Sequence, residues 1–386
     1  MISSPAPESP SLSRVVFVMD DLHRPNGIVS AVDLLASHMR QRGLRVDLLC
    51  FGPCDEEFKE SHHVITAMPG RRLSTEMAGY SRSKPALKPL RRAITPVWWP
   101  LAKARLRRIA DTWEPGTLVV GAGLDSVRLL TQAGVRPAVL VSQVHADVLA
   151  LTQQQRSLLH SAAESSCTIT ALTPEGAEEL ERWGLPSVFL ANPAPEAREQ
   201  ADVEHSRTVV YIGRLARAKQ VDHLIEAFAH VAPRDWKLRI YGAGPMEGEL
   251  RAMVEGADAD IELCGTVSDV APVLNGAAIH ALPSQAEGLA MSILEANMAG
   301  VPTIAYNATP GVRLAAGPSA RLVALDDRRA FEEALSELMR DDAARARAGR
   351  QAREHGRAFS ASAVVDQWMS LWGQLAPRAE LAPAPR

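Results

Sequence analysis

The chain has 386 residues, of which 46% are hydrophobic and 23% are charged, and its formal net charge is −3. This length is typical of about two domains, and the composition is that of a globular protein with ample apolar material for its cores. The small net charge excludes a protein held to nucleic acid or a membrane by its overall charge. The four cysteines show no paired metal-ligand spacing, as expected for free thiols in a reducing cytosol.

The first half of the chain alternates short apolar runs with amphipathic helical stretches. After a polar, Pro- and Ser-rich stretch at 1–13, for which we expect a disordered tail, helices are predicted at 27–43 and 174–184. Strands are predicted at the apolar runs 14–20, 44–52, 117–123, 137–145 and 167–173. Strand–helix alternation predicts a parallel sheet with helical crossovers, so 14–195 is expected to form an open, doubly wound α/β domain.

A second domain is expected after a break in the pattern. Residues 196–207 are polar, lack periodicity and predict an interdomain linker, after which strands and helices alternate again over 208–358. A closing helix is expected at 359–376 and a disordered tail at 377–386. Two such domains facing one another would form a cleft at the carboxyl ends of both sheets, where open α/β sheets bind ligands.

The loop after the first strand of the second domain carries two cations. In "YIGRLARAKQVDHLIEAF", residues 211–228, the strand ends at Gly213, and Arg214 and Lys219 precede the next helix. Basic side chains at the carboxyl edge of a parallel strand can neutralise a diphosphate leaving group. A solvated loop that is basic without binding a ligand is the alternative.

Glycine-rich turns follow the next two strands of this domain. "YGAGPMEGEL" contains Gly242 and Gly244, and "CGTVSDV" contains Thr266. Such turns let backbone N–H groups approach an anion or a base. A tight turn between a strand and a helix explains the same glycines equally well.

Two acids lie eight positions apart in "AEGLAMSILEA", residues 286–296. Glu287 lies in the turn after a strand, a helix is expected to begin shortly after Gly288, and Glu295 lies about two turns along nearly the same face. The first-turn backbone donors without a helical acceptor are those of Gly288, Leu289 and Ala290. Two carboxylates on one pocket wall could hold sugar hydroxyls and a ribose diol; two surface glutamates are the alternative.

Taken in order, "GRLARAKQVDHLI", "YGAGP", "CGTVSDV" and "LPSQAEGLAMSILEANMAGVPTIAYN" resemble the motif series of the retaining family-4 glycosyltransferases of the GT-B fold. The resemblance extends over about residues 14–375. It implies two Rossmann-like domains facing across a cleft, and an EC 2.4 hexosyltransferase that moves a sugar from a nucleotide-sugar to an acceptor with retained configuration. It implies no metal and no other cofactor. A UDP-sugar is the expected donor, and a GDP-sugar is the alternative.

The resemblance also implies roles for individual residues. Arg214 and Lys219 would hold the donor diphosphate, Glu287 the donor sugar, and Glu295 the ribose. His145, at the end of the strand 137–145, matches a histidine that the family directs at the donor sugar, although a structural histidine is the alternative. The further donor-binding positions that the resemblance implies are Gly27, Gly213, Gly242, Gly244, Thr266, Gly288, Leu289 and Ala290.

This chain departs from the family pattern at two of these positions. Asn26-Gly27 stands where many relatives have a pair of glycines, which changes the phosphate contacts expected there. Ala290 stands where glycine is frequent, and its methyl group would narrow the sugar pocket.

The segment 71–108 is strongly basic, with 11 Arg and Lys residues against the single acid Glu76, a net of +10. Cations interleaved with tryptophan favour an anionic lipid surface or a polyanionic polymer such as a polyol phosphate. The expected contact residues for such an acceptor are Arg91, Arg92, Trp98, Trp99, Arg107 and Arg108. A solvated basic excursion with core-facing tryptophans is the alternative, and no nucleic-acid-binding fold accompanies the segment.

The expected partners are therefore a nucleotide-sugar donor and a sugar, polyol-phosphate polymer or lipid-linked acceptor, with no nucleic acid. The chain shows no apolar stretch of spanning length. We expect a cytoplasmic protein. Peripheral attachment to the inner face of the membrane is a further option that the basic segment leaves open. Two other functions stay open: a nucleotide-sugar 2-epimerase of the same fold and a non-catalytic protein that binds anionic surfaces.

Overall fold

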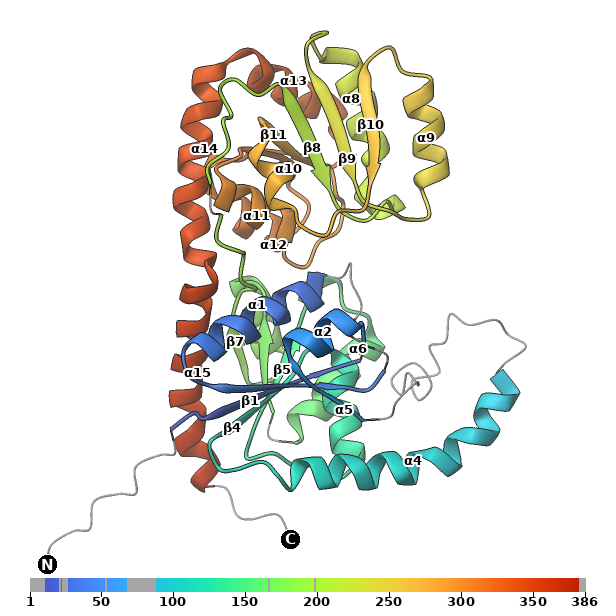
Figure 1. The fold of residues 1–386 in the computed structure, drawn as a ribbon, viewed down its shortest axis with the longest axis vertical. Coiled ribbons are helices and arrows are strands. Elements are labelled where there is room, and N and C mark those ends of the chain that lie inside the picture. The colour runs from blue at the N-terminus through green and yellow to red at the C-terminus, as the bar shows by residue number, and fades with distance from the viewer. Residues whose placement is uncertain are drawn as a thin grey trace, which may run out of the picture. The chain divides into compact units, whose positions relative to one another are not determined.

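The computed structural model describes residues 11–20, 22, 27–52, 54–67, 88–165, 167–197 and 199–381, without the side chains of Glu57, 88–98 and 378–381. Most of the expected tail at 1–13 and the first part of the basic segment, to residue 87, lie outside the described residues. The chain divides into two compact units, shown in Figure 1: a first unit, Met1–Leu190 with Val365–Arg386, and a second unit, Ala191–Val364.

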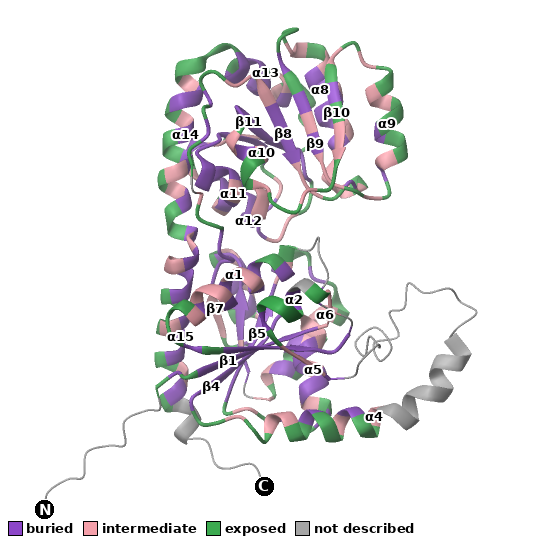
Figure 2. Ribbon diagram, viewed as in Figure 1, coloured by how far each residue is buried: buried purple, intermediate pink, exposed green. Residues whose placement is uncertain are grey.

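The first unit is built on a seven-stranded sheet in the order β3-β2-β1-β4-β5-β6-β7, and every pairing is parallel. This confirms the doubly wound sheet predicted from strand–helix alternation. The central strands are buried along their whole length, as Figure 2 shows, because helices cover a parallel sheet on both faces. The strands are β1 Arg14–Met19, β2 Arg45–Cys50, β3 His63–Thr66, β4 Thr117–Gly121, β5 Val139–Val144, β6 Thr168–Ala171 and β7 Ser187–Phe189.

Two helices of this unit begin at a threonine that caps them. Thr152 forms a reciprocal capping box with Gln155 at the start of α6, and Thr173 caps α7, whose first residue is Pro174. The helices are α1 Gly27–Gln41, α2 Glu56–Ser61, α4 Lys88–Ala110, α5 Leu124–Gln132, α6 Gln153–Ala163 and α7 Pro174–Arg182, with a short 3₁₀ turn, η2, at Val148–Ala150.

The last helix, α15 at Ala361–Leu381, returns the chain to the first unit. Its Trp368 is fully buried and meets the ring of Phe17 edge-on, with 6.4 Å between ring centroids. The helix continues five residues beyond residue 376, where we expected it to end, and the remainder of the expected tail lies outside the described residues.

The second unit contains a six-stranded parallel sheet in the order β10-β9-β8-β11-β12-β13. The strand order reverses between β8 and β11, and open α/β sheets bind ligands at such a switch point, beyond the carboxyl ends of the strands. The strands are β8 Thr208–Ile212, β9 Lys237–Tyr241, β10 Asp260–Gly265, β11 Ile279–Leu282, β12 Thr303–Tyr306 and β13 Arg321–Val323.

Two groups of helices accompany this sheet: α8 packs against α9 and α13, while α11 packs against α10, α12 and α14. The helices are α8 Val221–Val231, α9 Glu247–Glu255, α10 Ala271–Asn275, α11 Met291–Ala299, α12 Pro310–Ala316, α13 Arg328–Arg340 and α14 Asp342–Gly356. Three short 3₁₀ turns complete the unit: η3 Arg217–Lys219, η4 Gly317–Ser319 and η5 Arg357–Phe359. Within the described part of the chain, no helix combines the length and the apolar composition needed to cross a membrane.

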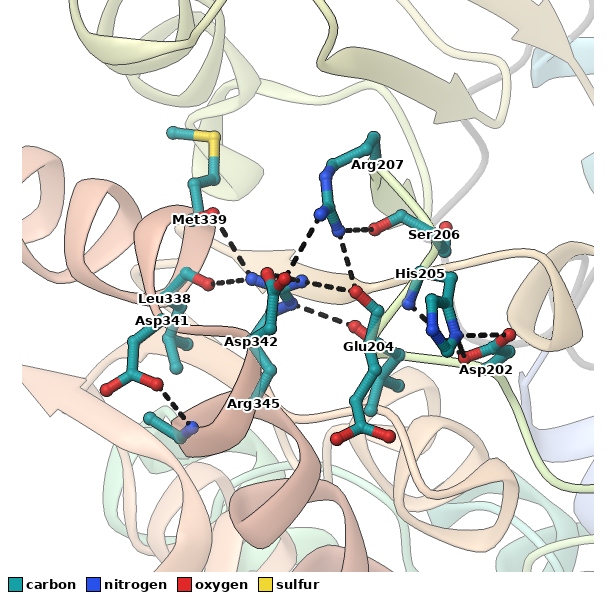
Figure 3. Close-up of polar contacts among 12 residues, drawn as sticks. Asp202, Glu204, His205, Ser206, Arg207, Leu338, Met339, Asp341, Asp342 and Arg345 are labelled. Carbon is teal, nitrogen blue, oxygen red and sulfur yellow. Dashed lines mark hydrogen bonds and ion pairs between the residues drawn. The ribbon is translucent and has the colours of Figure 1, made fainter.

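A buried arginine on α14 ties the segment before β8 into the second unit (Figure 3). The Arg345 guanidinium has no exposed surface and donates to the carbonyls of Val203 at 2.9 Å and Glu204 at 3.0 Å. It also donates to the carbonyl of Leu338 at 2.7 Å and lies over the ring of Trp236. The stretch 196–207, for which we expected a linker, therefore contributes packed backbone to the second unit.

Candidate functional site

The motif residues of the second unit gather around the loops that follow β8 and β11, the two strands at the switch point of its sheet. The loop after β8 runs from Gly213 to Gln220 and contains η3, and the loop after β11 runs from Pro283 to Ala290. The Gln285 N–H donates to the Ala218 carbonyl at 3.0 Å and joins the two loops through their backbones.

An ion pair between these loops links two of the predicted site residues. The Lys219 ammonium lies 2.6 Å from Oε1 of Glu287, and it also lies 3.4 Å from the Ala286 carbonyl. The Lys219 side chain is 22% exposed and that of Glu287 is 14% exposed, so water screens the pair only partly. Lys219, which we expect to bind the diphosphate, is therefore paired with Glu287, which we expect to bind the sugar.

The tyrosine at the end of β8 fixes the start of the first loop. Tyr211 is fully buried, and its hydroxyl donates to the Arg214 carbonyl at 3.1 Å. Burial, with a contribution from the Glu287 carboxylate, raises the pKa of Tyr211 above its usual range, so the phenol stays protonated. A Cβ at Gly213 would lie 2.8 Å from that hydroxyl, so the position of Tyr211 leaves no room for a larger residue at position 213.

Arg214 presents a cation that no described residue neutralises. Its residue is exposed, and within the described part of the chain its guanidinium has neither an ion-pair nor a hydrogen-bond partner. Because a guanidinium offers several donors in one plane, Arg214 is available to bind an anionic oxygen group beside the Lys219–Glu287 pair.

The two glycines after β9 allow the loops after β8 and β9 to touch. Gly242 has φ +148°, and a Cβ there would lie 1.8 Å from the Gly213 carbonyl oxygen. A Cβ at Gly244 would lie 2.2 Å from the carbonyl oxygen of Leu215, whose N–H donates to the Ala243 carbonyl at 3.0 Å. Loop-to-loop packing is thus sufficient to explain both glycines, and their role in donor binding stays a prediction.

The turn before α11 offers unpaired backbone donors beside Glu287. The helix begins at Met291, close to the expected position, and its N-cap residue supplies no side-chain hydrogen bond. None of the amides before it finds an acceptor among the described residues; these are the N–H groups of Gly288, Leu289 and Ala290. Unpaired amides at a helix start attract an anion or a sugar oxygen.

Glu295 lies on the second turn of α11 as a partly buried acid. Its carboxyl group is enclosed by protein, and this burial raises the pKa of Glu295 to about 7. None of the described residues donates a hydrogen bond to this carboxyl group or forms an ion pair with it. An acid in that state is suited to accept hydrogen bonds from a hydroxyl-bearing ligand.

Sequence reasoning missed the glycine that packs beneath this turn. A Cβ at Gly311, in the first turn of α12, would lie 1.8 Å from the Gly288 carbonyl oxygen. The "TPG" at 309–311 is a helix-start signal, since Thr309 caps α12 and Pro310 opens it, but nothing in the sequence indicates which backbone the glycine meets. Thr266, the residue after β10, is exposed, and its donor-binding role stays a prediction.

Two predicted site residues belong to the first unit. His145 follows β5, and neither of its ring nitrogens has a hydrogen-bond partner among the described residues. Burial lowers the pKa of His145 to about 4, so the imidazole is neutral near pH 7. Gly27 is the exposed first residue of α1. The roles of both residues toward a donor stay predictions.

The described part of the basic segment, 88–108, lies in helix α4, whose described side chains divide between packing and exposure. Trp99 packs against the core of the first unit, with the Lys103 ammonium 5.9 Å from its ring centroid. Arg107 and Arg108 are both exposed, although Arg107 also donates from Nε to the Ala133 carbonyl at 2.7 Å, and Leu101 is 57% exposed. The side chains of Arg91, Arg92 and Trp98 lie outside the described residues.

The described residues contain no group of three or more His, Cys, Asp or Glu placed to hold a metal ion. The site in the second unit therefore consists of one ion pair, one unpaired arginine, one enclosed acid and a row of unpaired amides. The expectation of metal-free chemistry stays a prediction.

Comparison with known proteins places this geometry in context. Residues 206–341 match the family described as Glycosyl transferases group 1. The chain is 33% identical to an exopolysaccharide phosphotransferase of Streptomyces coelicolor over 225 residues, which are 56% of this chain and 24% of the relative. It is 30% identical to a D-inositol 3-phosphate glycosyltransferase of Corynebacterium glutamicum over 244 residues, 59% of this chain and 57% of the relative. The chain thus spans less than two thirds of either relative.

Among solved structures, the chain resembles TarM of S. aureus with a TM-score of 0.74 at 12% sequence identity, over 93% of this chain and 99% of that one. That structure is of a mutant in complex with fondaparinux, alpha-GlcNAc-glycerol and UDP. The likeness extends over most of both units and confirms the GT-B fold that the motif series implies.

Proposed function

We propose that this chain, which belongs to the group 1 glycosyltransferases and has the GT-B fold, moves a hexose-type sugar from a nucleotide-sugar to an acceptor with retained configuration. The observation that carries the proposal is the Lys219–Glu287 pair, 2.6 Å apart, beside the unpaired Arg214. It brings Lys219, a cation suited to a diphosphate, into contact with an acid suited to sugar hydroxyls, at the switch point of the sheet, and Arg214 in the same loop supplies a second cation.

In this mechanism the anomeric carbon loses its bond to the donor diphosphate and gains a bond to the acceptor oxygen on the same face. Arg214 and Lys219 bind the departing diphosphate and stabilise the negative charge that develops on it. The acceptor proton moves to an oxygen of that diphosphate, so protons and charge balance without a protein nucleophile. Glu287 accepts hydrogen bonds from the sugar hydroxyls and holds the ring for attack.

The nucleotide is bound further along α11. Glu295 accepts hydrogen bonds from the ribose diol, and its enclosed position makes each of these bonds stronger than it would be in water. We propose UDP as the nucleotide. The presence of UDP in the solved TarM complex supports this choice, and a GDP-sugar is the competing outcome.

For the acceptor we propose a sugar-bearing molecule rich in phosphate, such as a polyol-phosphate polymer or a lipid-linked sugar. Exposed cations on α4 support an anionic acceptor, and the names of relatives that act on an inositol phosphate and on an exopolysaccharide agree with it. A cytoplasmic enzyme attached peripherally to the inner face of the membrane fits this acceptor.

The test begins with a thermal-shift panel of UDP- and GDP-sugars on the full chain, because a ligand that binds only the folded state raises Tm. The nucleotide-sugar that raises Tm most is then incubated with the enzyme and candidate acceptors, and products are identified by mass and by anomeric configuration. Transfer with retention supports the proposal. Release of a free epimer without acceptor would favour an epimerase, and liposome binding without nucleotide-sugar turnover would favour a non-catalytic surface protein.

A further inference from the structure

Two residues with unusual backbone conformations contact one another beside Lys219. Among the described residues, the non-glycine positions with positive φ are Gln220, at 47°, and Asp326, at 63°. Such conformations crowd the Cβ of an L-residue and persist where the surrounding structure holds them. The Nε2–H of Gln220 donates to Oδ1 of Asp326 at 2.7 Å, across 106 residues of sequence.

The conformation of Gln220 sets the direction of the backbone after Lys219. It ends η3, whose last residue is Lys219, and it is also the residue before α8 begins at Val221. Its left-handed conformation turns the backbone between the two helices, since continued right-handed geometry would run η3 directly into α8. The path of the backbone directly after Lys219 therefore depends on the conformation of Gln220.

Asp326 reaches Gln220 from a turn on the far side of the loop. The Asp327 N–H donates to the Ala324 carbonyl at 3.1 Å and closes the turn between β13 and α13, with Asp326 at its third position. On its other side, the loop is held by the Gln285 N–H, which donates to the Ala218 carbonyl at 3.0 Å. The backbone around Lys219 is thus fixed from two directions by residues of two other loops.

We propose that Asp326, acting through Gln220, is a positioning residue that directs the Lys219 ammonium toward the donor diphosphate. The inference rests on the proposed function and assigns Asp326 no contact with the donor. Without the Gln220–Asp326 hydrogen bond, Gln220 relaxes to a right-handed conformation, and Lys219 spends less time in the direction that binds phosphate. A cation held in place before the ligand arrives loses less conformational entropy on binding.

The test compares Asp326→Ala with Asp326→Asn in the full chain, with affinity for UDP and GDP measured by titration calorimetry and Tm measured in parallel. Loss of one net hydrogen bond should weaken nucleoside-diphosphate binding about three- to tenfold in Asp326→Ala. Asn keeps an oxygen at the same place, so Asp326→Asn should bind within about twofold of wild type. Donor KM should rise in Asp326→Ala more than kcat falls.

The neighbouring residue offers a matched control. Asp327 caps α13 by accepting from the Ala330 N–H at 3.0 Å, so Asp327→Ala should lower Tm without changing diphosphate affinity. In a Lys219→Ala background, Asp326→Ala should have no further effect on diphosphate affinity, because it acts through that lysine. In Gln220→Gly, which adopts the left-handed conformation freely, Asp326→Ala should also add nothing.

The possible results distinguish a failure of the Asp326 positioning role from a failure of the proposed function. If wild type binds UDP or GDP and Asp326→Ala binds it equally well, or loses only Tm as Asp327→Ala does, the positioning role is wrong while the proposed function stands. If Asp326→Ala weakens binding as much in the Lys219→Ala background as in wild type, the role is also wrong. A wild-type chain that binds no nucleoside diphosphate overturns the proposed function, and the positioning role with it.

Discussion

The ammonium of Lys219 and the carboxylate of Glu287 neutralise each other across two loops, at 2.6 Å. In the absence of a ligand, each is therefore the other's main counter-charge. A bound diphosphate would take over Lys219, and a sugar hydroxyl would take over Glu287, so the donor exchanges one set of charge contacts for another. Part of the electrostatic gain of binding is then spent on separating the pair, which favours a donor that satisfies both residues at once.

Lys219→Ala should lower kcat/KM for transfer by roughly a hundredfold, because a single stabilising group at such a site contributes about 3 kcal/mol to lowering the barrier. Steady-state kinetics with saturating acceptor measures the loss, and circular dichroism checks the fold. The matched control is Arg217→Ala, in the same 3₁₀ turn, whose side chain is exposed and pairs with Glu249. Near-normal turnover in Lys219→Ala would disprove the diphosphate assignment.

Substitution of Glu287, in the turn before α11, and of Glu295, on α11, should affect different kinetic constants. Glu287→Gln should chiefly lower kcat, since the acid acts on the sugar, and Glu295→Gln should chiefly raise the donor Kd, since the acid acts on the ribose. Hydrogen bonds to charged groups contribute about 1.5–3 kcal/mol, which corresponds to losses of roughly ten- to a hundredfold. Kinetics and calorimetry on both variants check the division. Wild-type values in both would mean that neither acid binds the donor.

Stability should depend on pH through Glu295. Burial raises its pKa from an ordinary value of 4.5 to about 7 in the folded chain. Between these values the unfolded chain has released the proton while the folded chain retains it, so the free energy of unfolding falls as pH rises through this window and levels off above it. The fall amounts to at most about 3 kcal/mol. Urea denaturation from pH 4 to 8 measures it, and Glu295→Gln should lack this component.

The same acid predicts a pH dependence of nucleotide binding. Ribose hydroxyls donate to the ionised carboxylate better than to the protonated acid. UDP affinity should therefore increase from pH 6 to pH 8 in wild type and change less in Glu295→Gln, as measured by calorimetry in buffers of matched ionic strength. An identical slope in both proteins would show that another group titrates.

The exposed cations of α4 should act on the acceptor alone. Reversing Arg105 and Arg108, both exposed, to Glu should raise the acceptor KM and leave the donor Kd unchanged, because the charged residues expected to bind the donor lie in the second unit. Added salt should have the same effect, since exposed charges are screened beyond about 8 Å at physiological ionic strength.

Arg107→Glu, on the same helix, tests a residue that combines exposure with a structural contact. Its Nε bond to the Ala133 carbonyl predicts a lower Tm in addition to any change in acceptor kinetics. If the Arg105 and Arg108 reversal leaves acceptor KM unchanged at low and at high salt, docking on α4 is wrong.

Much of the fold could be predicted from periodicity, and some elements could not. The long apolar runs became the buried central strands, whereas β3 and β7 were missed because they are short edge strands with half-exposed side chains. The order of the motifs located the loops after β8 and β11. It could not indicate the Lys219–Glu287 contact, since a shared sheet edge does not fix which side chains meet.

The Gln220–Asp326 contact lay beyond sequence reasoning for a different reason. Glycine or asparagine signals a left-handed turn, and glutamine does not. Asp326 reads as an ordinary acid before a helix, next to Asp327, which is the actual cap. A hydrogen bond across 106 residues depends on the packing of the whole sheet, which local patterns do not contain.

Arg345 also decides where the second unit can be cut from the chain. Its guanidinium takes carbonyl partners from Val203, 142 residues earlier, and from Glu204, and both lie ahead of the first strand of that unit. A fragment that starts at Thr208 lacks both of these acceptors and should therefore be less stable than one that keeps them. A fragment that starts at Ala191 keeps both acceptors. The N-terminal limit of a stable second unit is therefore set by Arg345, a residue near the C-terminal end of that unit.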